Sequence, residues 1–194
     1  MLTEEHEEDT GRRVWLSEQE VNDLLALPED QQRRIALALG SRCGLRSHEI
    51  VKVAPKHVVD TEAGTMLTVP EGKGDKYRET PIPEALAASI RSIGQFRDAP
   101  EDTPVVGKAT RTLRRWIQEY RENMAEETDD DRWLYLSTHD LRRTWAGQLA
   151  NADVDETVAL RWGGWNDLET FLNHYRGEAT AKAQKRERAN VDWV

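Results

Sequence analysis

The sequence predicts an α+β fold that is mainly α-helical and carries one small antiparallel β-sheet. Most of the chain repeats apolar residues at the spacing of an amphipathic helix. Between about residues 56 and 82 the pattern changes to strand-like alternation, interrupted by glycine-containing turns. A chain of 194 residues, of which 38% are hydrophobic, is long enough for one domain with a buried core.

The N-terminal end is expected to differ from the rest. Residues 1–15 are predicted to form an acidic, flexible tail, because their charged stretch shows no apolar period. The first helix begins after Ser17, which forms a capping-box pattern with Glu20, and it ends at Pro28. The second helix, over residues 29–44, carries an apolar stripe made of Ile35, Leu37, Ala38 and Leu39.

The predicted sheet occupies the middle of the chain. Its three strands are expected at residues 56–60, 65–69 and 77–82, with turns at 62–64 and 72–75. The segments that follow it are a helix over 83–93, a loop-like stretch over 94–108 and a longer helix over 109–126.

Short helices are predicted after the acidic loop 126–131, near residues 138–151, 154–162, 166–176 and 179–190. Residues 16–177 are therefore expected to form the folded domain, and residues 178–194 a helical, basic C-terminal tail.

The overall charge bears on nucleic-acid binding. A net charge of −9 opposes it, since Lys and Arg must neutralise the phosphates. However, acidic residues gather near the N-terminus and in the loop 126–131. Such a surface would suit a salt-adapted protein of an archaeal type.

Other compositional features exclude several classes of protein. The single Cys43 cannot form an internal disulfide, and the five histidines lack metal-ligand spacing. No apolar run has the length of a membrane span, and the N-terminus is acidic. We therefore expect a cytoplasmic protein that binds neither metal nor membrane.

Several segments carry side chains that suit phosphate chemistry. His139 and Arg142 stand three residues apart, so a helix places both on one face. The segment GLRSHEI at residues 44–50 supplies Arg46, and GKGDKYRETPIP at residues 72–83 supplies a lysine at a turn. A Gly-Gly-Trp turn and a short helical run ending in a tyrosine follow downstream.

These segments, in this order, resemble the catalytic domain of the tyrosine recombinases, the phage-integrase family of DNA breaking and joining enzymes. The resemblance covers about residues 16–177. It implies strand transesterification through a 3′-phosphotyrosyl intermediate, without metal, ATP or another cofactor. The residues that match the catalytic motif are Arg46, Lys73, His139, Arg142, Trp165 and Tyr175.

The resemblance also implies a role for each group. Arg46 and Arg142 would grip nonbridging phosphate oxygens, since a guanidinium is planar and always charged. Lys73 would protonate the leaving 5′ oxygen, and His139 would accept or relay the proton of the tyrosine. Trp165 would donate its indole N–H to a phosphate oxygen.

The expected nucleophile departs from the family pattern. His174 occupies the place where the family has its tyrosine, and Tyr175 comes one residue later. One residue is about 100° of helix rotation. Either the turn 165–168 absorbs an extra residue, or the site is altered or inactive. Lys76 is likewise an alternative to Lys73 as the proton donor.

Basic residues outside this set are candidates for DNA contact. They flank the hairpin lysine or follow one predicted helix, and they are Lys76, Arg78, Lys108, Arg111, Arg114 and Arg115. The alternative for the helix is a solvated face balanced by Glu119 and Glu122. For Arg46, the alternative is a structural ion pair with Glu49.

The resemblance makes a site-specific recombinase or integrase the leading functional hypothesis. Its partners would be double-stranded DNA and other copies of the chain, with a tetramer on DNA and a monomer as the alternative in solution. We expect the family's N-terminal core-binding domain to be absent and the tail 178–194 to dock on a neighbouring protomer. The alternatives are a non-catalytic DNA-binding regulator and a type IB topoisomerase-like enzyme.

Overall fold

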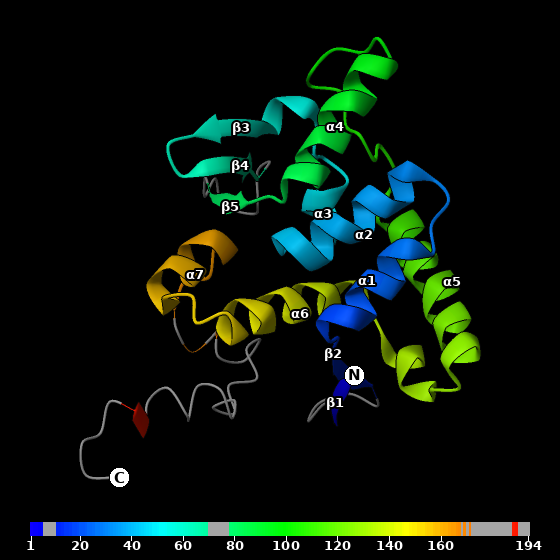
Figure 1. The fold of residues 1–194 in the computed structure, drawn as a ribbon. Helices are drawn as coiled ribbons and strands as arrows, with labels where there is room; N and C mark the ends of the chain where they lie inside the picture. Colours follow the sequence, from blue (N-terminus) through cyan, green and yellow to red (C-terminus); the bar gives the residue numbers. More distant parts are fainter. Residues whose placement is uncertain (6–10, 70–77, 168, 170, 172–187, 190–194) are drawn as a thin grey trace.

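The computed structural model describes residues 1–5, 11–69, 78–167, 169, 171, 188 and 189. Its elements, in chain order, are β1 (Leu2–Glu5), β2 (Arg12–Trp15), α1 (Glu18–Ala26), α2 (Gln31–Cys43), α3 (Ser47–Ile50), η1 (Pro55–His57), β3 (Val58–Thr61), β4 (Gly64–Thr68), β5 (Glu79–Pro81), α4 (Glu84–Phe96), α5 (Thr110–Thr128), η2 (Asp131–Tyr135), α6 (Thr138–Asn151) and α7 (Glu156–Gly163). The predicted class, mainly α with a small antiparallel sheet, is confirmed, and β1 and β2 form a second sheet that was not predicted (Figure 1).

The central packing unit is α2 against α6 (Figure 1). Leu141 of α6 lies so close to Gly40 of α2 that a Cβ there would stand 3.0 Å from its Cδ1 atom. The core around this contact includes fully buried Leu37, Leu39 and Leu113. Burial of these side chains is the main favourable contribution to folding, and it fixes α6 relative to the N-terminal helices.

Both N-terminal helices occur where they were predicted, with ends that differ by one or two residues. Ser17 and Glu20 form the expected capping box at α1. The Asp30 carboxylate accepts hydrogen bonds from the first backbone N–H groups of α2. Gly44, with φ of 65°, ends α2 in the left-handed conformation and turns the chain toward α3.

The three-stranded sheet has the order β3-β4-β5 and is antiparallel throughout. It lies beside α4 in Figure 1. Its first strand begins at Val58, two residues later than predicted, because the Ala54 N–H donates to His57 Nδ1 (2.9 Å) and closes a 3-10 turn. The predicted helices at 83–93 and 109–126 are confirmed, and each extends slightly further toward its C-terminus.

The prediction of a flexible tail over residues 1–15 is wrong for the part that the structure describes. Strands β1 and β2 pair antiparallel, with Glu4 opposite Arg13 and Glu5 opposite Arg12. Opposite charges that face each other across two strands favour pairing. The prediction of a tail considered only how many charged residues the segment holds and not which of them face each other. Val14 and Trp15 enter the core.

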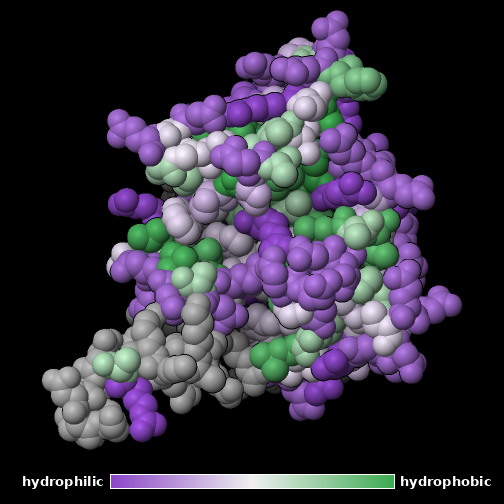
Figure 2. Space-filling view, viewed as in Figure 1, coloured by the Kyte–Doolittle hydropathy of each residue, from purple (hydrophilic) through white to green (hydrophobic). Residues whose placement is uncertain are grey.

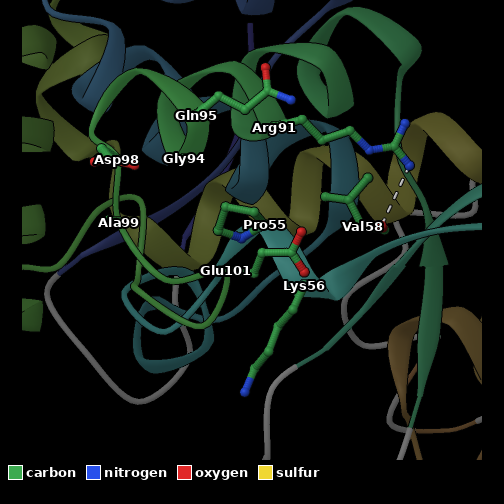
Figure 3. Close-up of a pocket in the computed structure, with 9 residues that line it drawn as sticks. All are labelled: Pro55, Lys56, Val58, Arg91, Gly94, Gln95, Asp98, Ala99 and Glu101. Carbon is green, nitrogen blue, oxygen red and sulfur yellow. Dashed lines mark hydrogen bonds between the residues drawn. The ribbon is translucent and has the colours of Figure 1, made fainter.

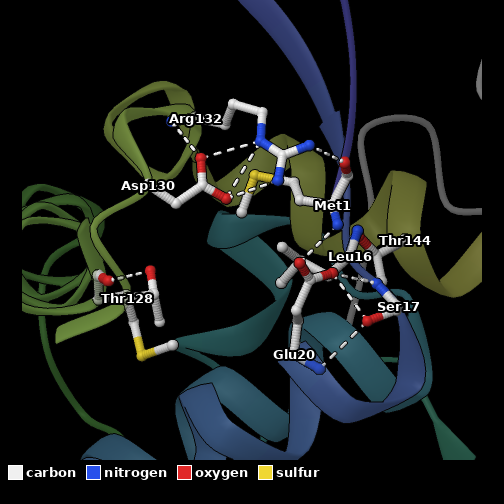
Figure 4. Close-up of polar contacts among 9 residues, drawn as sticks. Met1, Leu16, Ser17, Glu20, Thr128, Asp130, Arg132 and Thr144 are labelled. Carbon is white, nitrogen blue, oxygen red and sulfur yellow. Dashed lines mark hydrogen bonds and ion pairs between the residues drawn. The ribbon is translucent and has the colours of Figure 1, made fainter.

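Polar contacts hold this N-terminal sheet on the domain (Figure 4). The Met1 amine contacts Glu20, and Arg132 donates to the Met1 carbonyl at 2.8 Å. On the β2 side, the Leu16 N–H donates to Thr144 Oγ1 of α6 (3.0 Å). The sheet is thus attached directly to α6.

The face of the molecule in Figure 2 is largely hydrophilic, with hydrophobic residues in small separate patches. Among the described helices, none combines the length and apolarity that crossing a membrane requires.

Gly44→Ala should destabilise the domain by about 3 kcal/mol or more, because a left-handed alanine is strained and its Cβ would overlap the Trp145 ring. Urea unfolding followed by circular dichroism measures this change in the free energy of unfolding. Gly64→Ala is the matched control, since Gly64 also has positive φ but no atom lies within 4 Å of an added Cβ. Equal losses in the two variants would show that the Trp145 contact is unimportant.

Candidate active site

Arg46 precedes the first residue of α3 and is held there by Glu49 of the same helix. Its backbone N–H donates to Glu49 Oε2 (2.7 Å), and its guanidinium Nη1 donates to Glu49 Oε1 (3.2 Å). The Glu49 side chain is 1% exposed, whereas that of Arg46 is 37% exposed. The predicted Arg46–Glu49 ion pair therefore exists, and it leaves one side of the guanidinium open to solvent.

Arg78 is the second partner of the buried Glu49 carboxylate. Its Nη2 donates to Glu49 Oε2 (2.7 Å), and its Nη1 donates to the Trp162 carbonyl of α7 (2.6 Å). The side chain is 6% exposed. We expected Arg78 to contact the DNA backbone from the surface; instead its guanidinium is buried and bonded within the domain. Burial lowers the pKa of Arg78, and the neighbouring Arg46 lowers it further, while Glu49 opposes the shift.

Arg142 projects from α6 into the same region. Its two terminal nitrogens donate to the carbonyls of Gly44 and Gly163, the second at 2.6 Å. Its Nε is buried and finds no hydrogen-bond partner within the described part of the chain. Burial, followed by the charges of Arg46 and Arg78, lowers the pKa of Arg142 well below its ordinary value. A guanidinium nevertheless stays charged at neutral pH, so this group adds a buried positive charge.

Trp165 is positioned by the turn that follows α7. Gly164 adopts the left-handed conformation, with φ of 64°, and the backbone N–H of Trp165 donates a hydrogen bond to the Leu160 carbonyl (3.1 Å). The ring stacks on Trp145 with centroids 5.8 Å apart, and Arg142 Cζ lies 4.4 Å from its centroid. The structure therefore brings Trp165 and Arg142 together, as the resemblance predicts.

His139 lies in the first turn of α6, one helical turn before Arg142, and its exposed side chain is partly covered by neighbouring residues. Partial burial lowers its pKa, and so do the cations Arg143, Arg142 and Arg114, while Asp140 opposes the shift. The imidazole is consequently neutral at pH 7 and able to accept a proton.

Three residues of the predicted catalytic and DNA-contacting sets lie outside the described residues. They are Lys73 at the predicted hairpin tip, Lys76 beside it, and the predicted nucleophile, Tyr175; the neighbouring His174 lies outside as well. Their positions relative to the arginine cluster stay a prediction.

The basic residues near the start of α5 lie on the surface, as expected. Lys108, Arg111, Arg114 and Arg115 are exposed. Arg115 lies 3.8 Å from Glu119, so the alternative of a charge-balanced face holds for that residue. Arg114, together with Arg121 and His139, lines a cavity of about 320 Å³ between α5 and the start of α6.

A larger cavity, of about 390 Å³, lies between α4 and η1, where Lys56, Arg91 and Glu101 extend around it (Figure 3). None of its lining residues belongs to the predicted site. No group of three or more metal-ligating side chains occurs among the described residues.

Two groups that hold the site were not predicted from sequence. The Gly44 and Gly163 carbonyls orient Arg142, and backbone acceptors carry no signal in a motif. Asp140 is buried, accepts from the Val14 N–H (3.1 Å) and pairs with Arg143. In the sequence, only the position of Asp140 next to His139 could have indicated that it supports the site.

The fold agrees with comparisons to known proteins. The chain matches the phage integrase family over residues 14–182 and therefore belongs to that family. It is 27% identical over 189 residues to tyrosine recombinase XerA of Pyrococcus furiosus, in a match that covers 91% of this chain and 62% of that protein. The chain thus spans less than two thirds of the length of this relative.

Solved structures show the same fold. The crystal structure of XerA recombinase has a TM-score of 0.70 at 20% identity, covering 91% of this chain and 64% of the other. The Tn1549 transposon integrase, in complex with a circular intermediate DNA, has a TM-score of 0.69 at 17% identity, covering 96% and 68%. XerH recombinase, bound to its palindromic difH substrate, has a TM-score of 0.66 at 18% identity, covering 92% and 52%.

His139 should titrate below the ordinary histidine pKa of about 6.5, as measured by proton NMR with His139→Gln as the variant that assigns the resonance. Between its folded and unfolded pKa values the unfolded chain binds more protons, so His139 favours folding above that window. This contribution is lost as the pH falls through the window.

Arg143→Gln should raise the pKa of His139, because a nearby cation is removed and Asp140 loses its partner. His57 is the internal control, since burial and Lys56 lower its pKa and Arg143 plays no part there. A His139 pKa at or above the ordinary value in the unmodified protein would contradict the electrostatic description of the site.

Proposed function

We propose that this chain cleaves and rejoins DNA strands as the catalytic domain of a site-specific recombinase or integrase. The observation that carries the proposal is the cluster of Arg46, Arg78 and Arg142 around one buried carboxylate, Glu49. Such an excess of guanidinium groups in a partly buried site suits a phosphodiester, because an anion offsets the repulsion between the cations.

The charge of the cluster fits the reaction. The three guanidinium groups exceed the carboxylate by two positive charges among the described residues. A phosphodiester carries one negative charge, and the pentacoordinate transition state of its transesterification carries two. Positive charge that is already in place therefore stabilises the transition state more than the ground state, which is what accelerates the reaction.

In the proposed reaction the Tyr175 oxygen attacks the scissile phosphorus. A bond forms between this oxygen and phosphorus, and the bond between phosphorus and the 5′ oxygen breaks. Neutral His139 accepts or relays the phenol proton, and Lys73 gives a proton to the leaving 5′ oxygen. Rejoining reverses these steps, so the energy of the bond is kept and no cofactor is required.

Double-stranded DNA is the proposed partner, and a tetramer is the proposed assembly on it. The relatives support the first of these, since the Tn1549 integrase was solved in complex with a circular intermediate DNA and XerH was solved bound to its difH substrate. The exposed basic residues at the start of α5 are the proposed contacts with the DNA backbone.

A nicked DNA substrate whose short leaving fragment, which carries the new 5′-hydroxyl, diffuses away after cleavage should trap a covalent protein–DNA adduct. A denaturing gel detects the adduct, and the mass of the modified peptide should assign the DNA to Tyr175. Tyr175→Phe should abolish the adduct because the nucleophilic oxygen is removed.

Arg46→Lys should slow adduct formation by about 100-fold, since an ammonium cannot replace the planar fork at a phosphate. Arg91→Lys is the matched control, because Arg91 forms its ion pair with Asp60 at the surface. The absence of an adduct at any salt concentration would favour the non-catalytic regulator, consistent with the late position of Tyr175. Supercoil relaxation without recombinant products would favour the topoisomerase-like alternative.

Arg114→Gln should weaken DNA binding uniformly across sequences and reduce the slope of log K against log salt by about one, because one phosphate contact is lost. Fluorescence anisotropy at several salt concentrations measures both quantities. Arg91→Gln removes the same charge from α4 and should leave the slope unchanged. An unchanged slope in Arg114→Gln would remove this residue from the DNA interface.

A further inference from the structure

Arg78 is the point at which three parts of the site meet. Its carbonyl accepts a hydrogen bond from the Val69 N–H (3.0 Å), which closes the base of the connection between β4 and β5. That connection contains Lys73. The Arg78 side chain leaves the sheet and reaches both Glu49, at the end of α3, and the Trp162 carbonyl, at the end of α7.

We propose that Arg78 is a positioning residue for strand cleavage, which neutralises Glu49 and fixes the Gly-Gly-Trp turn so that Arg46 and Trp165 face the scissile phosphate. This inference rests on the proposed function, and it replaces the surface DNA contact that we expected from sequence.

The first part of this role is electrostatic. A buried carboxylate must be paired, and Glu49 divides its two oxygens between Arg46 and Arg78. The contact with Arg78 is shorter, 2.7 Å against 3.2 Å, and the Arg78 guanidinium is the more buried. Arg78 therefore forms the tighter and more buried ion pair with Glu49, and the half-exposed Arg46 keeps donors for a phosphate. Without Arg78, Glu49 would draw Arg46 inward.

The second part is the position of Trp165. The last carbonyls of a helix have no hydrogen-bond donor within the helix. At the end of α7, two adjacent carbonyls accept hydrogen bonds from buried arginines. Arg78 binds the Trp162 carbonyl and Arg142 binds the Gly163 carbonyl. The aliphatic part of Arg78 lies against Gly164, where a Cβ would overlap it. The turn that leads into Trp165 is thus held from both sides.

Only arginine satisfies both contacts together. One terminal nitrogen points at the Glu49 carboxylate and the other at the Trp162 carbonyl, as the rigid fork of a guanidinium permits. A lysine has its three donors on a single nitrogen, so it cannot place separate nitrogens at the two acceptors as the guanidinium does. Arg78→Lys should therefore keep the charge next to Glu49 while losing the bond to the turn.

The test compares single-turnover adduct formation at saturating DNA in Arg78→Lys and Arg78→Met, with Arg91→Met as the matched control on the surface. We expect cleavage to fall by about 10-fold in Arg78→Lys and about 100-fold in Arg78→Met, since small displacements of positioned groups cost this much. DNA affinity should change less than two-fold in both, because Arg78 is buried. A loss of DNA affinity equal to the loss of cleavage would instead make Arg78 a DNA contact and overturn the proposal.

A charge-compensation experiment separates positioning from general destabilisation. Arg78→Met leaves Glu49 short of a partner, so removing the carboxylate charge with Glu49→Gln in the same chain should restore cleavage by about 10-fold or more. If Arg78 only filled space, the second substitution would slow cleavage further. This double variant also stands in for Arg78→Met if the single variant does not fold.

Hydrogen exchange gives a measurement that does not depend on activity. In Arg78→Lys the amides of Gly164 and Trp165, which bond to the last turn of α7, should exchange about ten-fold faster, with α2 unchanged. Unchanged exchange would refute the role of Arg78 even if the unmodified protein cleaves DNA. Faster exchange in Arg78→Lys, with no adduct from the unmodified protein, would refute the proposed function and leave the structural role of Arg78 in place.

Discussion

The candidate site depends on one buried carboxylate. Glu49 is 1% exposed and accepts from the Arg46 backbone, the Arg46 guanidinium and the Arg78 guanidinium. Burying an unpaired carboxylate costs several kcal/mol of folding free energy. The arginines that pair with Glu49 are therefore held within hydrogen-bond distance of it. α3 is thereby joined to the residue that precedes β5 and, through the Arg78 bond to the Trp162 carbonyl, to α7. The positive charges that remain can face a phosphate because one anion holds the surrounding elements in place.

Helix α6 is fixed from several directions at once, which suits a helix that carries His139 and Arg142. Its apolar face packs on α2, where Leu141 meets Gly40. Backbone N–H groups of the N-terminal segment donate to Asp140 and Thr144. At the other side, Arg142 bonds to the Gly44 and Gly163 carbonyls. Rigid support of this kind is what a preorganised electrostatic site requires, because the charges must not rearrange during the reaction.

Helical elements between α1 and α7 could be predicted because caps, glycines and apolar periods act locally, as Ser17 and Gly44 illustrate. The motif residues Arg46, Arg142 and Trp165 could be assigned by resemblance, and the structure places them near one another. Features that depend on long-range pairing were missed. The pairing of β1 with β2 requires a register between two charged strands, and the burial of Arg78 requires Glu49 and the Trp162 carbonyl, both far from it in sequence.

We propose that Arg46 and Arg142 act by neutralising the charge of the scissile phosphate. The most direct measurement compares cleavage of an ordinary phosphodiester with cleavage of a methylphosphonate, in which one charged oxygen is replaced by a neutral methyl group. Removing the guanidinium with Arg142→Ala should slow cleavage of the phosphodiester by about 100-fold or more, but that of the methylphosphonate by less than about 10-fold, because little charge remains to be stabilised. Equal losses on both substrates would contradict the account and assign Arg142 a purely structural role.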